Sequence, residues 1–374
     1  MKTQSYSNFW QEIHNSAKTE GFPLRVMFEL TYKCNFSCKH CYVPENYRKK
    51  RELKTREVFL ILEQLKELGC FYLGFTGGEP FTRKDILEIL LYAKRCGFQV
   101  IIYTNGSLLD KKIVDALARL RTNKVDITIP AMSKSAFERI SGVANSRDKV
   151  FRAIDLLYKK GVNLGFKTCV LKENENEIKD IRDFTRSLGA LHRLDTMLSR
   201  RLNGSSEPYK YRGRLKENLD AGCQILDTSK VNLKEHERES NIENRTSKIK
   251  DLFRCGVGVS QAAITPQGEL KMCLMIDYPK YKILNSHFVP RLSSLVHRKE
   301  GLKEAWEELK SLVSTIKPDK NYQCYKCELK AYCKWCPGRG WLHQRNFTAC
   351  DPDYRTWAES RYRITQMGAR KDIG

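Results

Sequence analysis

The sequence of 374 residues lacks the features of a membrane or secreted protein. It contains no run of 18 apolar residues, so we expect no transmembrane helix and no membrane partner. Its first 21 residues are polar and have no apolar signal-peptide core, so we expect a cytoplasmic protein. Disulfides are rare in the cytoplasm, and the 14 cysteines therefore indicate metal ligands.

Acidic residues are few relative to basic ones. The chain has 44 Asp and Glu against 67 Lys and Arg, which gives a formal net charge of +23. This surplus favours a polyanionic partner, either a nucleic acid or an acidic peptide, but it also fits a lysine-rich solvated surface. Because no single basic block dominates, we favour the solvated surface over nucleic-acid binding.

The most informative motif is a cysteine triplet with C-x3-C-x2-C spacing, formed by Cys34, Cys38 and Cys41. Three thiolates on one short loop can hold three irons of a [4Fe–4S] cluster. The fourth iron then has no protein ligand, and an open metal position is typical of a reactive site. The alternative is a zinc site completed by a distant Cys or His.

The triplet resembles the signature of the radical S-adenosylmethionine (radical SAM) superfamily, in which an aromatic residue takes the place of His40. Family members also carry the motif found here as Gly77-Gly78-Glu79-Pro80, at the end of the next strand. Glycines let backbone carbonyls approach a ligand closely, and Glu79 is an acceptor for a cationic ammonium group. The resemblance implies a cluster that binds S-adenosylmethionine and reductively cleaves it to a 5′-deoxyadenosyl radical.

Apolar runs alternate with amphipathic helical patterns through residues 24–199, which predicts βαβ units and a parallel α/β sheet. The six expected strands are 24–30, 70–76, 99–103, 125–129, 163–170 and 194–198. The expected helices are 55–68, 85–95, 111–120, 149–160 and 177–188. The cysteine loop, Gly77–Pro80 and residues 104–106 all follow strand ends, where the active sites of α/β barrels lie. The resemblance implies a partial (βα)6 barrel.

A second set of seven cysteines lies in the C-terminal third. Taken alone, the set fits zinc knuckles and iron–sulfur clusters equally well. Beside the radical SAM motif it resembles the SPASM domain, a cysteine-rich α+β extension with two auxiliary [4Fe–4S] clusters, which implies three clusters in all. The departure from the family pattern is that two residues, not three, separate the third and fourth cysteines of the central group. The implied outer ligands are Cys324, Cys327, Cys333 and Cys350, and the implied inner ligands are Cys255, Cys273 and Cys336.

The inner cluster lacks an obvious fourth ligand, because residues 256–272 contain no cysteine. An open iron there could bind a substrate thiolate or accept an electron from a substrate radical. Cys223 is the best spare ligand, since it lies in a polar, irregular segment. The other cysteines, which fall on predicted strands or helices, are expected to be buried small hydrophobic residues; they are Cys70, Cys96 and Cys169.

These patterns divide the chain into five segments. Residues 203–254 are rich in Lys, Arg, Glu, Asn and Ser, which fits a solvated connection somewhat better than a mobile segment near the substrate. The expected segments are 1–23 (N-terminal), 24–202 (barrel), 203–254 (linker), 255–352 (SPASM domain) and 353–374 (C-terminal helix).

Several residues are candidates for binding S-adenosylmethionine. The resemblance implies that Gly77 to Glu79 bind its amine. By position, Asn105 and Thr128 at successive strand ends are candidates for the ribose and carboxylate, and Tyr42 for the adenine; each is as readily structural. Asp277 is the one candidate general base, although a turn-forming aspartate is the more ordinary interpretation.

The resemblance implies an enzyme that modifies a peptide or protein side chain. We favour a ribosomally synthesised peptide precursor (RiPP) that receives a thioether or carbon–carbon crosslink, with flavodoxin or ferredoxin as reductant. The basic surface suits an acidic leader peptide. Residues 1–23 are too few for a fused leader-recognition domain, so we expect none.

Two other functions stay open. Sulfatase maturases, which oxidise a Cys or Ser side chain, share this architecture but tend to carry eight auxiliary cysteines where this chain has seven. A zinc-ribbon nucleic-acid-binding protein is the non-enzymatic alternative. Gly77–Pro80 and the βα alternation argue against it.

Overall fold

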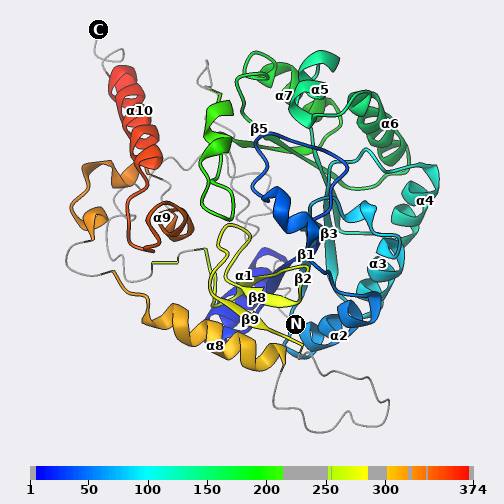
Figure 1. Cartoon of the computed structure of the whole chain (residues 1–374), viewed down its shortest axis with the longest axis horizontal. Coiled ribbons are helices and arrows are strands. Elements are labelled where there is room, and N and C mark those ends of the chain that lie inside the picture. Colours follow the sequence, from blue (N-terminus) through cyan, green and yellow to red (C-terminus); the bar gives the residue numbers. More distant parts are fainter. Residues whose placement is uncertain are drawn as a thin grey trace.

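The computed structural model describes residues 6–213, 252–253, 255–284, 301–318, 322–333 and 336–369. A curved sheet ringed by helices forms one side of the molecule, and the cysteine-rich C-terminal part lies beside it (Figure 1). Cys223, the proposed spare ligand, lies outside the described residues, as does most of the expected linker 203–254. No described helix is both long and apolar enough to span a membrane.

The six expected parallel strands are present, and each pairs with the next in chain order. They are β1 (Arg25–Thr31), β2 (Tyr72–Gly77), β3 (Gln99–Thr104), β4 (Lys124–Thr128), β5 (Leu164–Cys169) and β6 (Leu191–Asp195). The parallel α/β fold is thus confirmed. The sixth strand begins earlier than predicted, because the apolar residues Met197 and Leu198 are buried in the loop after it rather than in the sheet.

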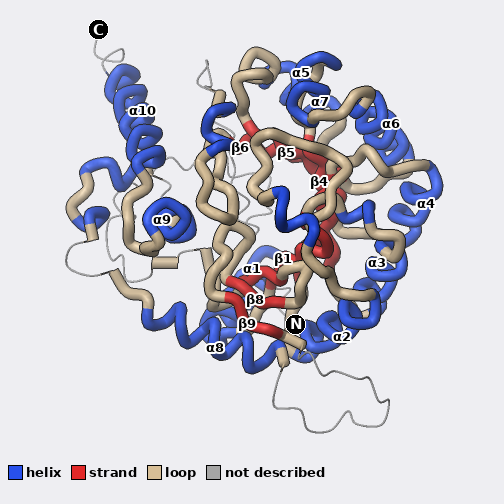
Figure 2. Tube along the Cα trace, viewed as in Figure 1, coloured by secondary structure: helices blue, strands red, loops and turns tan. Residues whose placement is uncertain are grey.

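Helices cover the outer face of these strands (Figure 2). The five predicted helices are α2 (Thr55–Glu67), α3 (Ile86–Arg95), α4 (Lys111–Leu120), α6 (Ser146–Lys159) and α7 (Ile178–Ser187). An unpredicted helix, α5 (Lys134–Ser141), precedes α6. Its N-cap is Ser133, whose hydroxyl accepts a hydrogen bond from the amide of Ala136.

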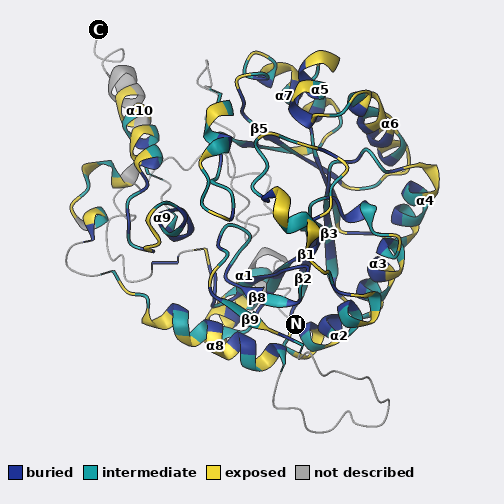
Figure 3. Ribbon diagram, viewed as in Figure 1, coloured by how far each residue is buried: buried dark blue, intermediate teal, exposed yellow. Residues whose placement is uncertain are grey.

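The core lies between helices and sheet, where each helix turns its apolar stripe inward (Figure 3). On α2 the stripe consists of Val58, Ile61, Leu62 and Leu65, all fully buried. Such spacing places these side chains on one helix face. Each side chain buried in this way contributes roughly 1.5–3 kcal/mol to folding. The barrel is therefore a rigid support for the loops at its strand ends.

The sheet extends further than the sequence predicted. β7 (Gln261–Ile264) pairs in parallel with β1, and β8 (Glu269–Lys271) and β9 (Lys280–Lys282) follow as antiparallel strands. The resulting order is β6-β5-β4-β3-β2-β1-β7-β8-β9. Main-chain hydrogen bonds between β7 and β1 therefore join the beginning of the cysteine-rich segment to the barrel.

The remaining helices lie at the two ends of the chain. They are α1 (Tyr6–Ser16), α8 (Leu302–Thr315), α9 (Pro337–Gln344) and α10 (Pro352–Ala369), the last of which overlaps the expected C-terminal helix 353–374. Trp306 of α8 is buried, and its indole N–H donates to the carbonyl oxygen of Gly21 at 2.7 Å. This contact ties α8 to the N-terminal segment.

Candidate functional site

The end of β2 is hydrogen-bonded to the chain that leads into the cysteine loop. The amide of Gly78 donates to the carbonyl oxygen of Thr31 at 2.6 Å, and the amide of Glu79 donates to that of Lys33 at 2.8 Å. A Cβ atom at Gly77, where φ is +136°, would lie 2.0 Å from the Thr31 oxygen. At Gly78 it would lie 2.2 Å from the Lys33 oxygen. The close approach that these glycines permit is therefore to the chain itself, next to Cys34.

We expect Gly78→Ala to prevent the cysteine loop from taking its native position. The new methyl group would overlap a backbone carbonyl, which cannot swing away as a flexible side chain can. The expected loss is more than about 4 kcal/mol in the free energy of unfolding, measured by denaturant titration. Gly161→Ala is the matched control, because nothing lies within 4 Å of its Cβ and only the positive φ of +65° is strained. That strain costs about 1–2 kcal/mol, so equal losses in the two variants would contradict the prediction.

Glu79 joins the ends of β2 and β3. Its carboxylate is fully buried and accepts three hydrogen bonds, from the amide of Phe81 (3.1 Å), the hydroxyl of Thr104 (2.8 Å) and the amide of Asn105 (2.7 Å). Burial raises the pKa of Glu79 to about 7, although the three donors act in the opposite direction. A carboxylate has about four acceptor positions. Three of these positions are filled by groups of the protein itself, so the buried carboxylate fastens the ends of β2 and β3 together.

Asn105 lies against the cysteine loop. Its side-chain NH2 donates to the Oδ1 of Asn35 at 2.9 Å and lies 3.9 Å from the Sγ of Cys34. Its own Oδ1 accepts from the amide and the hydroxyl of Ser107. Thr128, the other polar candidate at a strand end, is half-buried at the end of β4, in register with Lys167 of β5.

The three thiols of Cys34, Cys38 and Cys41 are half-buried on one loop. Burial raises the pKa of Cys34 and of Cys38, and the charge of Cys41 acts in the same direction on both. Three thiols on one short loop are a donor set that fits a [4Fe–4S] cluster, in which each thiolate binds a different iron. The irons of such a cluster would hold the thiols deprotonated.

Two residues beside the triplet point into the protein. The hydroxyl of Tyr42 donates to Oε1 of the buried Glu29 at 2.9 Å. Burial, together with the charge of Lys167, lowers the pKa of the half-buried His40 to about 4. His40 is therefore a neutral ring at pH 7.

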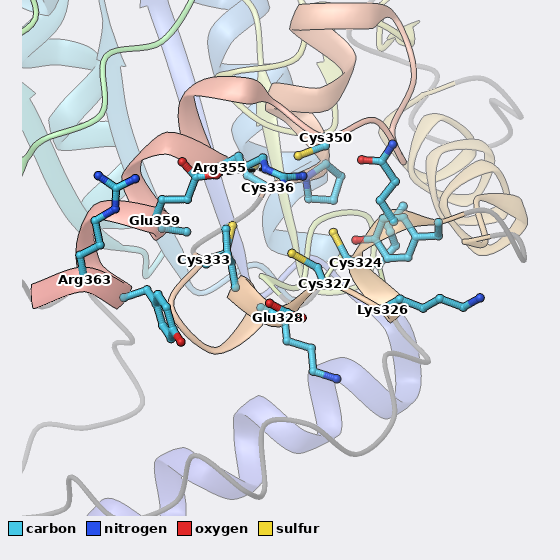
Figure 4. A pocket seen from close by; sticks show the side chains of 18 of the residues that line it. Cys324, Lys326, Cys327, Glu328, Cys333, Cys336, Cys350, Arg355, Glu359 and Arg363 are labelled. Atoms are coloured by element: carbon cyan, nitrogen blue, oxygen red, sulfur yellow. Dashed lines mark hydrogen bonds and ion pairs between the residues drawn. The ribbon is translucent and has the colours of Figure 1, made fainter. Parts of the chain in front are cut away.

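The C-terminal cysteines surround a cavity of about 1160 Å³ (Figure 4). It is larger than the roughly 300–1,000 Å³ typical of small-molecule sites. Six of the seven expected auxiliary ligands line it: Cys255, Cys324, Cys327, Cys333, Cys336 and Cys350. Cys255 comes from the chain before β7, and the others come from the short helical turns of residues 323–333 and from the chain on either side of α9. The cavity therefore depends on residues far apart in the sequence.

Electrostatic influences among these thiols fall into two groups. Burial raises the pKa of Cys350, and Cys324 and Cys327 add to the effect. Burial likewise raises the pKa of Cys273 to about 12, and here the added charges are those of Cys336 and then Cys255. The first group contains three of the four expected outer ligands, without Cys333, and the second contains the three expected inner ligands.

The carboxylate of Asp277, the candidate base, already has two partners in the protein. Its Oδ2 accepts from the hydroxyl of Tyr47 at 2.6 Å, and its Oδ1 lies 2.7 Å from the Nζ of Lys280. Tyr47 belongs to the short helix Glu45–Lys49 that follows the cysteine loop. These contacts join that helix to β9, so they give Asp277 a structural role.

Sequence reasoning missed two buried ionic residues. Arg339 of α9 donates to the carbonyl oxygens of Leu198 (3.0 Å) and Met197 (2.7 Å), and thereby holds α9 against the chain that follows β6. Lys271 pairs with Glu29 in the barrel interior at 2.8 Å. The sequence signal for each residue was its place near a cysteine. Arg339 lies three residues after Cys336, and Lys271 lies two residues before Cys273.

The other three cysteines differ in burial. Cys70 is buried, as predicted for a small hydrophobic residue. Cys96 and Cys169 are only half-buried, which corrects the prediction for them. Cys96 ends α3, and Cys169 is the last residue of β5, so each sits at the end of an element, where packing is less complete.

Part of the chain matches a known protein family, and two curated proteins are similar to it. Residues 28–185 match the family model described as "Radical SAM superfamily". PqqA peptide cyclase of Gluconobacter oxydans (strain 621H) is 32% identical over 169 residues, 45% of this chain and 47% of that protein. AdoMet-dependent heme synthase of Methanosarcina barkeri (strain Fusaro / DSM 804) is 24% identical over 354 residues, 88% of this chain and 95% of that protein.

Among solved structures, Streptococcus suis SuiB bound to S-adenosylmethionine has a TM-score of 0.62 and 16% identity, and covers 91% of this chain and 80% of that chain. This similarity shows a shared fold that includes the cysteine-rich part as well as the barrel. The chain spans about half the length of the PqqA peptide cyclases that it matches.

Proposed function

We propose, from the membership of residues 28–185 in the radical SAM superfamily, that this protein is an enzyme that modifies a side chain of a peptide. One observation carries the proposal. The loop that bears Cys34, Cys38 and Cys41 is hydrogen-bonded to Gly78 and Glu79, and both segments lie at the carboxyl ends of barrel strands.

The cysteine triplet would hold a [4Fe–4S] cluster whose fourth iron is left to the amino and carboxylate groups of S-adenosylmethionine. When bound, the cluster supplies the electron that cleaves this molecule to a 5′-deoxyadenosyl radical. The protein positions the reactants. We assign binding of the ammonium group to the segment Gly77–Glu79, which lies at the end of β2 and is hydrogen-bonded to the chain that leads into the cysteine loop.

Three further residues take roles from their contacts. Thr128, at the end of β4, is our candidate for a hydrogen bond to the ribose or carboxylate. Asn105 and Tyr42 bond to other parts of the protein, and we assign them to positioning the cysteine loop. We assign no proton transfer to Asp277, because it is ion-paired.

We further propose two auxiliary [4Fe–4S] clusters. Four thiols that line the C-terminal cavity, Cys324, Cys327, Cys333 and Cys350, would hold the outer one. The inner one would be held by Cys255, Cys273 and Cys336 and would keep one iron open. Donation of electrons by flavodoxin or ferredoxin and recognition of an acidic leader belong to the same proposal.

Two relatives favour a peptide as substrate. One is named PqqA peptide cyclase, and SuiB has been crystallised with its precursor peptide SuiA. A second candidate is a tetrapyrrole, because the match to AdoMet-dependent heme synthase extends over 88% of this chain. The family match argues against a zinc-ribbon nucleic-acid-binding protein, and nothing in the comparisons favours sulfatase oxidation over peptide crosslinking.

The proposal is tested by anaerobic reconstitution with iron and sulfide, followed by dithionite and S-adenosylmethionine. We expect about twelve irons per chain and release of 5′-deoxyadenosine. Added PqqA or SuiA peptide should then lose two hydrogen atoms for each crosslink, seen by mass spectrometry. Conversion of iron coproporphyrin III with both peptides unchanged would establish the tetrapyrrole alternative. Bound zinc without sulfide, and no cleavage, would overturn the enzyme assignment.

A further inference from the structure

A fully buried ion pair joins β1 to β8, and none of the roles assigned above uses it. Glu29 of β1 and Lys271 of β8 are both fully buried, and the Lys271 Nζ lies 2.8 Å from Glu29 Oε2. Neither charge has access to solvent that would screen it. Charges placed in such an environment act over longer distances than surface charges do.

Two tyrosines connect this pair to the cysteine loop. The hydroxyl of Tyr32 donates to Glu29 Oε2 at 3.0 Å, and that of Tyr42 donates to Oε1 at 2.9 Å. Tyr32 lies just before the first cysteine of the triplet, and Tyr42 directly follows the last. The anion of the pair is therefore hydrogen-bonded to both ends of the loop.

The cation belongs to the other cluster site. Lys271 is the last residue of β8 and lies two residues before Cys273, an expected inner auxiliary ligand. In the sheet, Lys271 lies in register with Ala263 of β7, and Ala263 lies in register with Met27 of β1. Because the side chain of Ala263 is short, Lys271 can reach across β7 to Glu29. One ion pair thus spans the two strands that lead to the two cluster sites.

Stability alone does not account for such a pair. A buried ion pair can often be replaced by apolar residues of similar volume without loss of stability, because desolvation offsets the Coulomb attraction. The potentials of iron–sulfur clusters, in contrast, respond to nearby charge and hydrogen bonding. A cation near a cluster favours its reduced state, which carries one more electron, and an anion disfavours it.

We propose that the Glu29–Lys271 pair sets the reduction potentials of the two neighbouring clusters relative to each other. Glu29 lowers the potential on the side of the cysteine triplet, and Lys271 raises it on the side of Cys273. Both are positioning residues that act through their charges. The inference rests on the proposed function, since it requires a cluster at each site.

The test is a pair of charge-removing variants. In Glu29→Gln the cation is left alone, and the potential of the S-adenosylmethionine-binding cluster should rise. In Lys271→Met the anion is left alone, and the potentials of both clusters should fall, that of the inner auxiliary cluster most. In the double variant neither charge remains, and both potentials should lie between those of the single variants. The potentials are read from redox titrations of the reconstituted protein followed by electron paramagnetic resonance.

Two controls separate charge from structure. Lys271→Arg keeps the charge and should keep the wild-type potential, while Lys179→Met removes an exposed charge paired with Asp183 on α7 and should not shift it. Shifts of the same sign in both single variants, or none, would overturn the inference. If the wild-type protein takes up only one cluster, the inference falls together with the auxiliary-cluster proposal. If it takes up all clusters and cleaves S-adenosylmethionine, the inference stands or falls alone.

Discussion

Replacing Cys38 with alanine is expected to abolish the cleavage of S-adenosylmethionine. Cys38 is the middle one of the three proposed ligands, and the loop itself has no fourth thiol. Cys169, whose charge acts on Cys38, belongs to the end of β5 and not to the loop. With two thiolates left, the cluster loses the ligand of one iron while a second iron must remain open. We expect iron content to fall by about four atoms per chain and 5′-deoxyadenosine to fall to the level of the iron-free protein. Iron analysis and chromatography of the reaction mixture measure both.

Cys96→Ala is the matched control for this change. Cys96 is also half-buried, but it ends α3 on the outer helical layer. It should keep wild-type iron content and cleavage. Retention of S-adenosylmethionine cleavage in Cys38→Ala would contradict the assignment of the triplet.

The fold could be predicted where local pattern and tertiary packing agree. The apolar stripe of α2 is complete in the sequence, and the helix follows it closely. β6 shows the limit, because the sequence cannot distinguish apolar residues that enter the sheet from Met197 and Leu198, which are buried in the loop beneath Arg339. β7 is four residues long and owes its place to pairing with β1, far away in the sequence. No local pattern encodes that pairing.

The site divides in the same way. The triplet and Gly77–Pro80 were identified because their chemistry is contained in short segments. The sequence did not show that the two segments touch. The contact that requires glycine at position 78 is made by the carbonyl oxygen of Lys33, which lies 45 residues earlier in the chain. The ion pair of Glu29 with Lys271 joins even more distant segments. Charged residues at such positions look like ordinary surface residues until the strands are assembled.

The partners of Asp277 also could not be predicted from the sequence. There, Asp277 was a carboxylate four residues after Cys273 with no identifiable partner. In the structure it is bonded to Tyr47 and Lys280, so its removal would first separate the helix Glu45–Lys49 from β9. Loss of activity in an Asp277 variant would therefore not identify it as a base.

Cys327→Ala is expected to separate the two stages of the proposed reaction. Cys327 lines the C-terminal cavity, and we propose it as a ligand of the outer cluster, apart from the triplet. Loss of this ligand should remove about four irons per chain while the barrel site stays intact. 5′-Deoxyadenosine should still form, because its formation requires only the triplet, but the crosslinked peptide should not.

The comparison variant for Cys327→Ala is Cys70→Ala, which removes a buried thiol outside the C-terminal cavity. It should keep full iron content and product formation. Unchanged crosslinking in Cys327→Ala with four irons lost would mean that the outer cluster takes no part in the chemistry. Unchanged iron content would mean that Cys327 is not a ligand. Only the combination of continued cleavage and missing product assigns the first electron to the barrel and a later step to the C-terminal cavity.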